Sequence, residues 1–198
     1  MSNKKEIEYW NNFYTSINTV KTCSDFCKFI LDFFDKNILL NNKEKIRVLD
    51  CGCGNGRDSY EISKKYKVDA IDNNGFLPDN NDNTNFYNSD FVNYKKTEYN
   101  LIYSRFTFHS INDKQQSDFL DSIAVNSYLA IETRSKKGED IDVVHGKTHY
   151  RNYTDIDYLT KILKEKSFQI IYINEGINMA IYKNENPICI RVICKKIE

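Results

Sequence analysis

The chain has 198 residues, 40% of them hydrophobic, and 28 basic residues balance 28 acidic ones, so the formal net charge is zero. A neutral chain provides no general positive field for nucleic acid, which makes a nucleic-acid partner a poor candidate. No apolar run approaches the roughly 20 residues that cross a bilayer, and the N-terminus lacks the apolar core of a signal peptide, so we expect a cytoplasmic protein that does not bind membranes.

Six cysteines are too few for a disulfide scaffold in a chain of this length. Cys23 and Cys27 are separated by three residues and Cys51 and Cys53 by one, whereas structural zinc sites commonly use a spacing of two. We therefore expect free, reduced thiols and no metal. The length and the lack of any linker or internal repeat predict a single domain.

The N-terminal part of the chain predicts two helices, over residues 6–17 and 22–37. Ser24 or Thr22 can cap the second helix. Within it, apolar residues recur at intervals of three or four, at Phe26, Ile30, Phe33 and Phe34.

From residue 45 onward the pattern alternates between buried strands and helices, which favours a parallel sheet covered on both faces. Strands are predicted at about 45–51, 67–72, 84–90, 99–106 and 126–133, and helices at about 58–66, 113–123 and 155–167. Between 73 and 85, where a crossover helix would be expected, Gly75 and Pro78 favour a loop instead. Two final strands, 168–176 and 187–196, are joined by only about a dozen residues, so they must be antiparallel.

The stretch RVLDCGCGNGRDS, residues 47–59, places three glycines between a strand and a helix. Glycines allow positive φ and a close approach of a ligand to the backbone, and the following helix N-terminus offers unpaired N–H groups. A nucleotide or nucleoside is the natural ligand. NAD-binding folds use the spacing G-x-G-x-x-G, whereas this sequence has G-x-G-x-G, which disfavours NAD.

The spacing, with Asp50 before it, resembles the first motif of class I S-adenosylmethionine-dependent methyltransferases, whose glycine loop lies against the amino acid part of the cofactor. The resemblance implies an α/β, Rossmann-like fold with a seven-stranded, mostly parallel sheet, helices on both faces and an antiparallel C-terminal strand pair. It implies a single methyltransferase domain over 1–198, with N-terminal helices over 1–40 covering the cofactor and an α/β core over 45–198. The motif supplies the first cofactor candidates, Asp50, Cys51, Gly52, Gly54, Gly56 and Arg57.

Further segments resemble the family in chain order. Asp72, followed by Asn73, ends the second strand, where the family binds the ribose hydroxyls; Asp90 and Phe91 match the segment that binds adenine. YNLIYSRFTFHSI, residues 99–111, resembles the strand motif beside the methyl-transfer site and supplies Ser104. EYWNNFYTS, residues 8–16, resembles a helix that closes over the cofactor and implicates Tyr14, with Trp10 as a second candidate. These aromatics could instead pack an amphipathic helix on the core.

The carboxyl ends of the later strands face the ligand crevice in such folds, so the residues there are candidates for binding the methyl acceptor. This set of residues is rich in cations, which favours a small anionic acceptor such as a phosphorylated or acidic sugar derivative. His109 is the candidate general base if the acceptor is a hydroxyl, since its reference pKa lies near 6.5. Alternatively His109 packs in the core, Glu132 pairs with Arg134, and Arg151 forms a surface ion pair. The catalytic candidates are Arg105, His109, Arg134, His149 and Arg151.

The last 70 residues or so resemble a subgroup of small bacterial methyltransferases that modify surface polysaccharides, including a capsular phosphoramidate group. The resemblance lies in IETRSKKGEDI, HYRNY and INEGINMAIYKNENPICIRVICKK. Three alternatives stay open: a nicotinamide-dependent oxidoreductase, a non-catalytic nucleoside-binding module, and methylation of RNA or protein, which the neutral charge disfavours.

Overall fold

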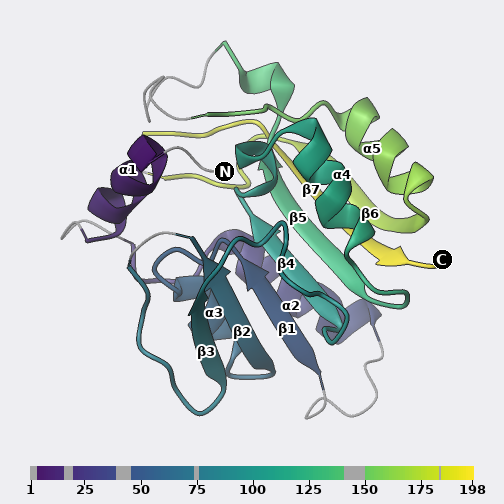
Figure 1. Cartoon of the computed structure of the whole chain (residues 1–198). Coiled ribbons are helices and arrows are strands. Elements are labelled where there is room, and N and C mark those ends of the chain that lie inside the picture. Colours follow the sequence, from purple (N-terminus) through teal and green to yellow (C-terminus); the bar gives the residue numbers. More distant parts are fainter. Residues whose placement is uncertain (1–3, 16–19, 39–45, 74–75, 141–149, 183) are drawn as a thin grey trace.

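The computed structural model describes residues 4–15, 20–38, 46–73, 76–140, 150–182 and 184–198. Its strands are Arg47–Cys51 (β1), Lys67–Asp72 (β2), Thr84–Asn88 (β3), Leu101–Arg105 (β4), Tyr128–Arg134 (β5), Phe168–Gly176 (β6) and Cys189–Lys196 (β7). They form one seven-stranded sheet in the order β3-β2-β1-β4-β5-β7-β6 (Figure 1). Strands β1 to β5 pair in parallel, and β7 lies antiparallel between β5 and β6. The predicted fold class is confirmed.

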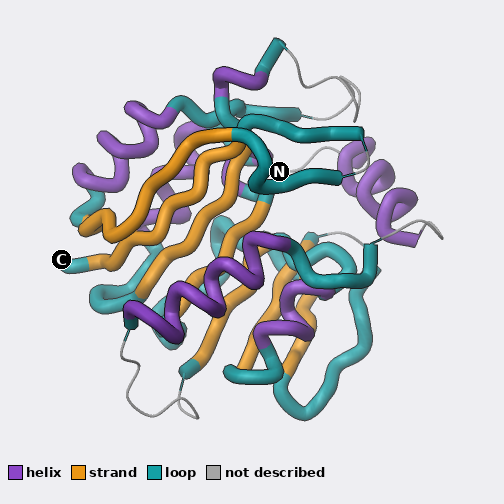
Figure 2. The backbone as a smooth tube through the Cα atoms, turned by 180° about the vertical axis from the view of Figure 1, so that it is seen from behind, coloured by secondary structure: helices purple, strands orange, loops and turns teal. Residues whose placement is uncertain are grey.

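Five α-helices accompany the sheet in the described residues: Lys4–Thr15 (α1), Asp25–Asn37 (α2), Arg57–Ile62 (α3), Asp113–Asp121 (α4) and Ile156–Glu165 (α5). Figures 1 and 2 show α2 and α3 on one face of the sheet and α4 and α5 on the other, while α1 lies beyond the sheet near the glycine turn. Helix α3 is shorter than predicted, because residues 63–65 continue as turns rather than as helix. Ser24 caps α2, as one of the two predicted candidates.

Alternation along the strands builds a separate core on each face of the sheet, because successive side chains of a strand point to opposite faces. In β1, Val48 packs with the α2 and α3 side, whereas Leu49 and Cys51 pack with the α4 and α5 side. The first core contains Phe26, Ile30 and Phe34 of α2, and the second contains Phe119 and Leu120 of α4 with Leu159 and Leu163 of α5.

The predicted loop between β2 and β3 is confirmed, since the described residues 76–83 contain no helix. Pro78 and the ring of Phe86 instead pack directly against Gly56. The connection from β2 to β3 thus packs against the glycine turn. None of the helices in the described ranges combines the length and the apolar character that crossing a bilayer requires.

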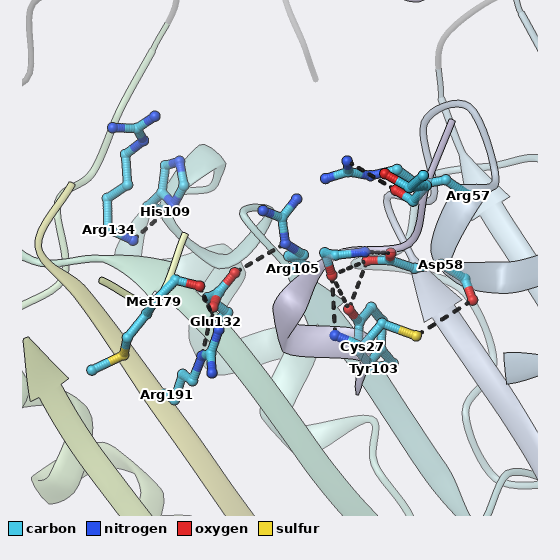
Figure 3. A network of polar contacts seen from close by, with 12 residues as sticks. Cys27, Arg57, Asp58, Tyr103, Arg105, His109, Glu132, Arg134, Met179 and Arg191 are labelled. Atoms are coloured by element: carbon cyan, nitrogen blue, oxygen red, sulfur yellow. Dashed lines mark hydrogen bonds and ion pairs between the residues drawn. The ribbon is translucent and has the colours of Figure 1, made fainter. Parts of the chain in front are cut away.

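A buried carboxylate joins α2 to α3 and to the sheet. Asp58, in the first turn of α3, accepts hydrogen bonds from the backbone N–H of Ser24 at 2.6 Å and from its hydroxyl at 2.7 Å. It also accepts one from the hydroxyl of Tyr103 on β4 at 2.8 Å (Figure 3). Ser24 in turn caps α2 by accepting from the N–H of Cys27. The start of α2 is therefore fixed to the start of α3.

We expect Asp58→Ala to lower the free energy of unfolding by about 2–4 kcal/mol, because it leaves three buried donors without their acceptor. Tyr103→Phe should cost about 1 kcal/mol, since it removes one of the three. Urea unfolding followed by circular dichroism measures both changes. Asp118→Ala is the control: its exposed pair with Lys114 should contribute less than about 0.5 kcal/mol. A loss for Asp58→Ala no larger than for Asp118→Ala would contradict this role.

Candidate active site

The turn between β1 and α3 depends on left-handed glycines. Gly52 and Gly54 have φ angles of 74° and 55°. A Cβ atom at Gly52 would overlap the methyl group of Thr107, and one at Gly54 would overlap the ring of Tyr14. Glycine is therefore required both by the backbone conformation and by the close approach of two neighbouring segments.

Three carboxylates lie around this turn, at the carboxyl ends of neighbouring parallel strands. Asp50 is the penultimate residue of β1 and accepts a 2.6 Å hydrogen bond from the hydroxyl of Ser59 on α3. Asp72 ends β2 and accepts a 2.8 Å hydrogen bond from the N–H of Gly54. Asp90 follows β3 and accepts from the N–H of Val92 at 2.9 Å. The strand order brings these three acids together.

Asp50 is buried, with 3% of its surface exposed. Burial raises the pKa of its carboxyl group to about 7, and the nearby negative charges of Asp58 and Asp72 add to the rise. The hydrogen bond from Ser59 and the positive charge of Arg105 act in the opposite direction. A positive ligand beside Asp50 would favour its ionised form.

A cavity of about 700 Å³ extends from this acidic end across the carboxyl ends of β1 and β4 to that of β5. Helix α1 contributes Trp10, Phe13 and Tyr14 to its wall. The desolvated hydroxyl of Tyr14 has a raised pKa, to which Asp72 adds. The predicted site residues that line the cavity are Tyr14, Asp50, Gly52, Arg57, Asp72, Asn73, Asp90, Phe91, Arg105, His109, Arg134 and Arg151.

Four predicted site residues do not line this cavity. The side chain of Cys51 is fully buried in the core on the α4 and α5 side, and Ser104 is fully buried, 2.6 Å from the hydroxyl of Thr107. Gly54 lies behind the ring of Tyr14, and Gly56 behind the ring of Phe86. A further one, His149, lies outside the described residues.

The other end of the cavity is basic and is organised by Glu132, whose side chain is completely buried. Arg105 donates through Nε to Oε1 of Glu132 at 2.9 Å, and Arg191 donates through Nε to Oε2 at 2.7 Å. Arg191 also donates through Nη2 to the carbonyl oxygen of Met179 at 2.6 Å. Figure 3 shows the terminal nitrogens of Arg105 pointing away from Glu132. Two guanidinium groups on one carboxylate leave this cluster with a net positive charge.

His109 and Arg134 lie next to this cluster (Figure 3). Arg134 donates through Nη2 to Oε2 of Glu185 at 3.3 Å, so the alternative pairing of Glu132 with Arg134 is not the one formed. The backbone N–H of Arg134 donates to Nδ1 of His109 at 3.3 Å, and the hydroxyl of Thr133 lies 3.2 Å from the same nitrogen. Because Nδ1 is an acceptor, the neutral imidazole carries its proton on Nε2.

Arg151 reaches the same cavity from the segment before α5, where its Nη1 donates to the hydroxyl of Tyr153 at 3.0 Å. The structure thus brings four of the five catalytic candidates to one end of one cavity. The pairing of β4 with β5 brings Arg105 and Arg134 together. The segment that carries Arg151 is held beside them by a 2.7 Å hydrogen bond from the N–H of Asn152 to the carbonyl oxygen of His109.

Several cavity residues could not be found by sequence reasoning. Phe106 and Thr107 lie within the motif segment 99–111, but nothing in the sequence indicates that both face the cavity. The segment between β6 and β7 contributes a further group, Ala180, Ile181, Tyr182 and Glu185. Little in the sequence indicates that this segment lines a cavity, because loop residues follow no periodic pattern. Only the antiparallel order of the last two strands places the segment near the end of β5.

Comparison with known proteins agrees with this arrangement. A family model described as a methyltransferase domain matches residues 21–173. By sequence, the chain matches no curated protein. The fold is similar to that of an S-adenosylmethionine-dependent methyltransferase from Anabaena variabilis, with 15% identity, a TM-score of 0.67 and coverage of 98% of this chain and 95% of that one.

Two further structures contain ligands. One is the 1,6-didemethyltoxoflavin-N1-methyltransferase of Burkholderia thailandensis with bound 1,6-didemethyltoxoflavin and S-adenosylhomocysteine. It has 12% identity, a TM-score of 0.61 and coverage of 87% of each chain. The magnesium protoporphyrin IX methyltransferase of Synechocystis PCC 6803, with S-adenosylmethionine bound, has 13% identity, a TM-score of 0.62 and coverage of 96% of this chain and 92% of that one. The family model spans most of the sequence, and the seven-stranded sheet gives the chain the fold of the solved methyltransferases. This chain therefore belongs to the class I S-adenosylmethionine-dependent methyltransferases.

Proposed function

We propose that the protein transfers a methyl group from S-adenosylmethionine to a small anionic acceptor. The observation that carries this proposal is the division of charge in one cavity. Acids outnumber Arg57 at one end, where Asp50, Asp72 and Asp90 lie, and arginines outnumber Glu185 at the other, where Arg105, Arg134 and Arg151 lie. S-adenosylmethionine supplies the methyl group from a positively charged sulfonium and also carries an ammonium group, both of which suit the acidic end. An anionic acceptor suits the basic end.

At the acidic end, we assign roles to the predicted cofactor residues that line the cavity. Asp72 would accept the ribose hydroxyls, Asp90 and Phe91 would hold the adenine, and Gly52 beside Asp50 would lie against the amino acid part. Asn73 and Arg57 border the same space, and Tyr14 would cover it from α1. In this proposal the N-terminal helices within 1–40 cover the cofactor mainly through α1, since α2 packs in the core, and 45–198 form the α/β core of a single domain.

At the basic end, Arg105, Arg134 and Arg151 would hold the anionic group of the acceptor. Glu132 and Glu185 do not cancel this charge, because Glu132 is shared by two guanidinium groups and Glu185 pairs with Arg134 alone, which leaves an excess of positive charge. Methyl transfer from a sulfonium is an in-line displacement, so the protein contributes mainly by aligning the acceptor and excluding water. Arginine suits this task, since its planar edge matches carboxylate and phosphate oxygens.

His109 would act as a hydrogen-bond donor rather than as a general base. Its Nδ1 accepts from the backbone of Arg134, so the neutral ring presents an N–H at Nε2. A donor can orient an anionic oxygen, and an oxygen that is already anionic needs no base before it attacks. The tautomer and an anionic acceptor are therefore mutually consistent.

The acceptor is proposed to be a small molecule. The toxoflavin precursor bound in the Burkholderia thailandensis enzyme supports this size class. A narrower form of the proposal is a phosphoramidate or sugar derivative of a capsular or other surface polysaccharide, which rests on the C-terminal sequence resemblance alone. RNA and protein acceptors are less favoured, because the formal net charge of the chain is zero.

The first test is calorimetric titration of the purified protein with S-adenosylhomocysteine, with NADH as a parallel ligand. We expect micromolar binding of the former and none of the latter. Asp72→Ala should weaken binding by about 1–3 kcal/mol through loss of charge-assisted hydrogen bonds. Asp79→Ala, an exposed acid beyond the cavity, is the matched control and should bind as the wild type does. If Asp72→Ala and the wild type bound S-adenosylhomocysteine with equal affinity, Asp72 would not be a cofactor-binding residue.

Replacement of His109 tests its role as a donor. A glutamine amide can also donate a hydrogen bond but cannot act as a base, so His109→Gln should retain more turnover than His109→Ala. The loss for His109→Ala should be about tenfold or more in kcat, with the affinity for S-adenosylhomocysteine unchanged. Initial rates with an acceptor from a screen of phosphorylated and nucleotide-linked sugars provide the measurement. Equal inactivity of both variants would instead support a general base.

The arginines test the charge of the acceptor. Arg134→Gln and Arg151→Ala should each raise the acceptor KM about tenfold or more, because each removes a charged donor to an anion. The KM for S-adenosylmethionine should stay close to the wild-type value. Thermal unfolding of both variants checks that the fold is retained, which matters most for the buried Arg134. If both variants had the wild-type KM for the acceptor, the proposal of an anionic acceptor would be contradicted.

A further inference from the structure

Phe106, immediately after β4, has a backbone conformation that is unusual for a residue with a side chain. Its φ angle is 58°, in the left-handed region that only glycine adopts without strain. Its N–H donates to the carbonyl oxygen of Glu132 at 2.8 Å, which fixes the turn to β5. A strained conformation at a cavity wall persists only where the surrounding structure enforces it, and it often marks a functional position.

The ring of Phe106 is the common neighbour of three acceptor-end residues. The Cζ atom of Arg105 lies 4.5 Å from the ring centroid, and the Cζ atom of Arg134 lies 5.3 Å from it. The imidazole of His109 packs against the ring at 65°, with centroids 5.8 Å apart. Phe106 also packs against the small apolar cluster of Met179 and Ala180, which holds the ring in place.

Contact with an aromatic ring uses a different part of a guanidinium group from a hydrogen bond. The cation is attracted to the ring quadrupole, whereas carboxylates and phosphates bind the N–H groups in the guanidinium plane. Arg105 already donates through Nε to Glu132, and Figure 3 shows its two terminal nitrogens turned away from that carboxylate. The ring therefore holds the arginine in position without competing with an anion for those terminal groups.

We propose that Phe106 is a positioning residue that arranges Arg105, His109 and Arg134 around its ring as one site for a carboxylate or phosphate oxygen group. The proposal deepens the proposed function and rests on it, because this site would hold the anionic group of the methyl acceptor. Without the ring, the two arginines would lose their shared neighbour and could turn to pair more fully with Glu132 and Glu185. The site would then lose its affinity for an external anion, although the fold and the cofactor end would be intact.

The experiment uses the full chain saturated with S-adenosylhomocysteine and titrated calorimetrically with inorganic phosphate, and in a second arm with acetate, at constant ionic strength. Phe106→Leu keeps an apolar side chain but removes the ring. It should weaken phosphate or acetate binding by about fivefold or more. Phe106→Tyr keeps the ring and should bind within about twofold of the wild type. The anion that binds more tightly to the wild type shows whether the site prefers a phosphate or a carboxylate group.

Two further variants separate the ring from the backbone. Phe106→Gly adopts the left-handed turn without strain and lacks the ring, so it should show the same loss as Phe106→Leu. Asn126 is a matched control, since its φ angle is 70° and it lies at the opposite end of the sheet, before β5. Asn126→Gly should leave both anion and S-adenosylhomocysteine binding unchanged.

The outcomes distinguish this proposal from the proposed function. Loss of anion binding in the leucine and glycine variants, rescue by tyrosine and unchanged S-adenosylhomocysteine affinity would support the positioning role. Unchanged anion affinity in Phe106→Leu, retention in Phe106→Gly, or a parallel loss of S-adenosylhomocysteine binding would overturn it. So would a wild-type protein that binds S-adenosylhomocysteine but neither anion. Failure of the wild type to bind S-adenosylhomocysteine would instead count against the proposed function.

Discussion

A carboxylate with no access to solvent must be paired with positive charge, and Glu132 forms ion pairs with two guanidinium groups. Its two oxygens face guanidinium groups from β4 and β7, strands on either side of β5. Arg191 carries the connection on to the backbone of Met179 and to the rings of Phe26 and Phe29 on α2. One buried acid thus ties together the central strands, the C-terminal segment and a covering helix. The basic end of the cavity follows from this arrangement.

The separation of charge in the cavity is a product of strand order. Parallel strands all end at the same edge of the sheet, so the residues at their carboxyl ends become neighbours. Asp50 and Asp72 lie at the carboxyl ends of β1 and β2, whereas Arg105 and Arg134 end β4 and β5. The acids therefore gather at β1 and β2, and the arginines at β4 and β5. In the proposed function, the cavity across this edge holds a positive cofactor beside a negative acceptor.

The sequence predicted the fold class because each element had a distinct local signal: β6, for instance, was predicted with its observed bounds, and Ser24 was among the predicted caps. Most of the site residues that it predicted line the cavity, since strand ends and glycine turns can be located from local patterns. It could not predict that Cys51 and Ser104 face the core, because the face of a residue depends on the pleat of a strand buried on both sides. Nor could it predict the pairing of Glu132 with Arg191, which are 59 residues apart, because that pairing depends on strand order.

The segment between β6 and β7 lies outside every ladder of the sheet and still supplies Ala180, Ile181, Tyr182 and Glu185 to the cavity. The strand hydrogen bonds end at Gly176 and begin again at Cys189, so side-chain contacts such as the pair of Glu185 with Arg134 hold this segment to the cavity. At the other end of the cavity, Gly52 and Gly54 of the β1–α3 turn are enclosed by other segments. In the proposed function, acceptor preference and cofactor recognition are therefore encoded in separate parts of the chain. Exchange of the segment between β6 and β7 would then alter contacts with the acceptor and leave the glycine turn in place.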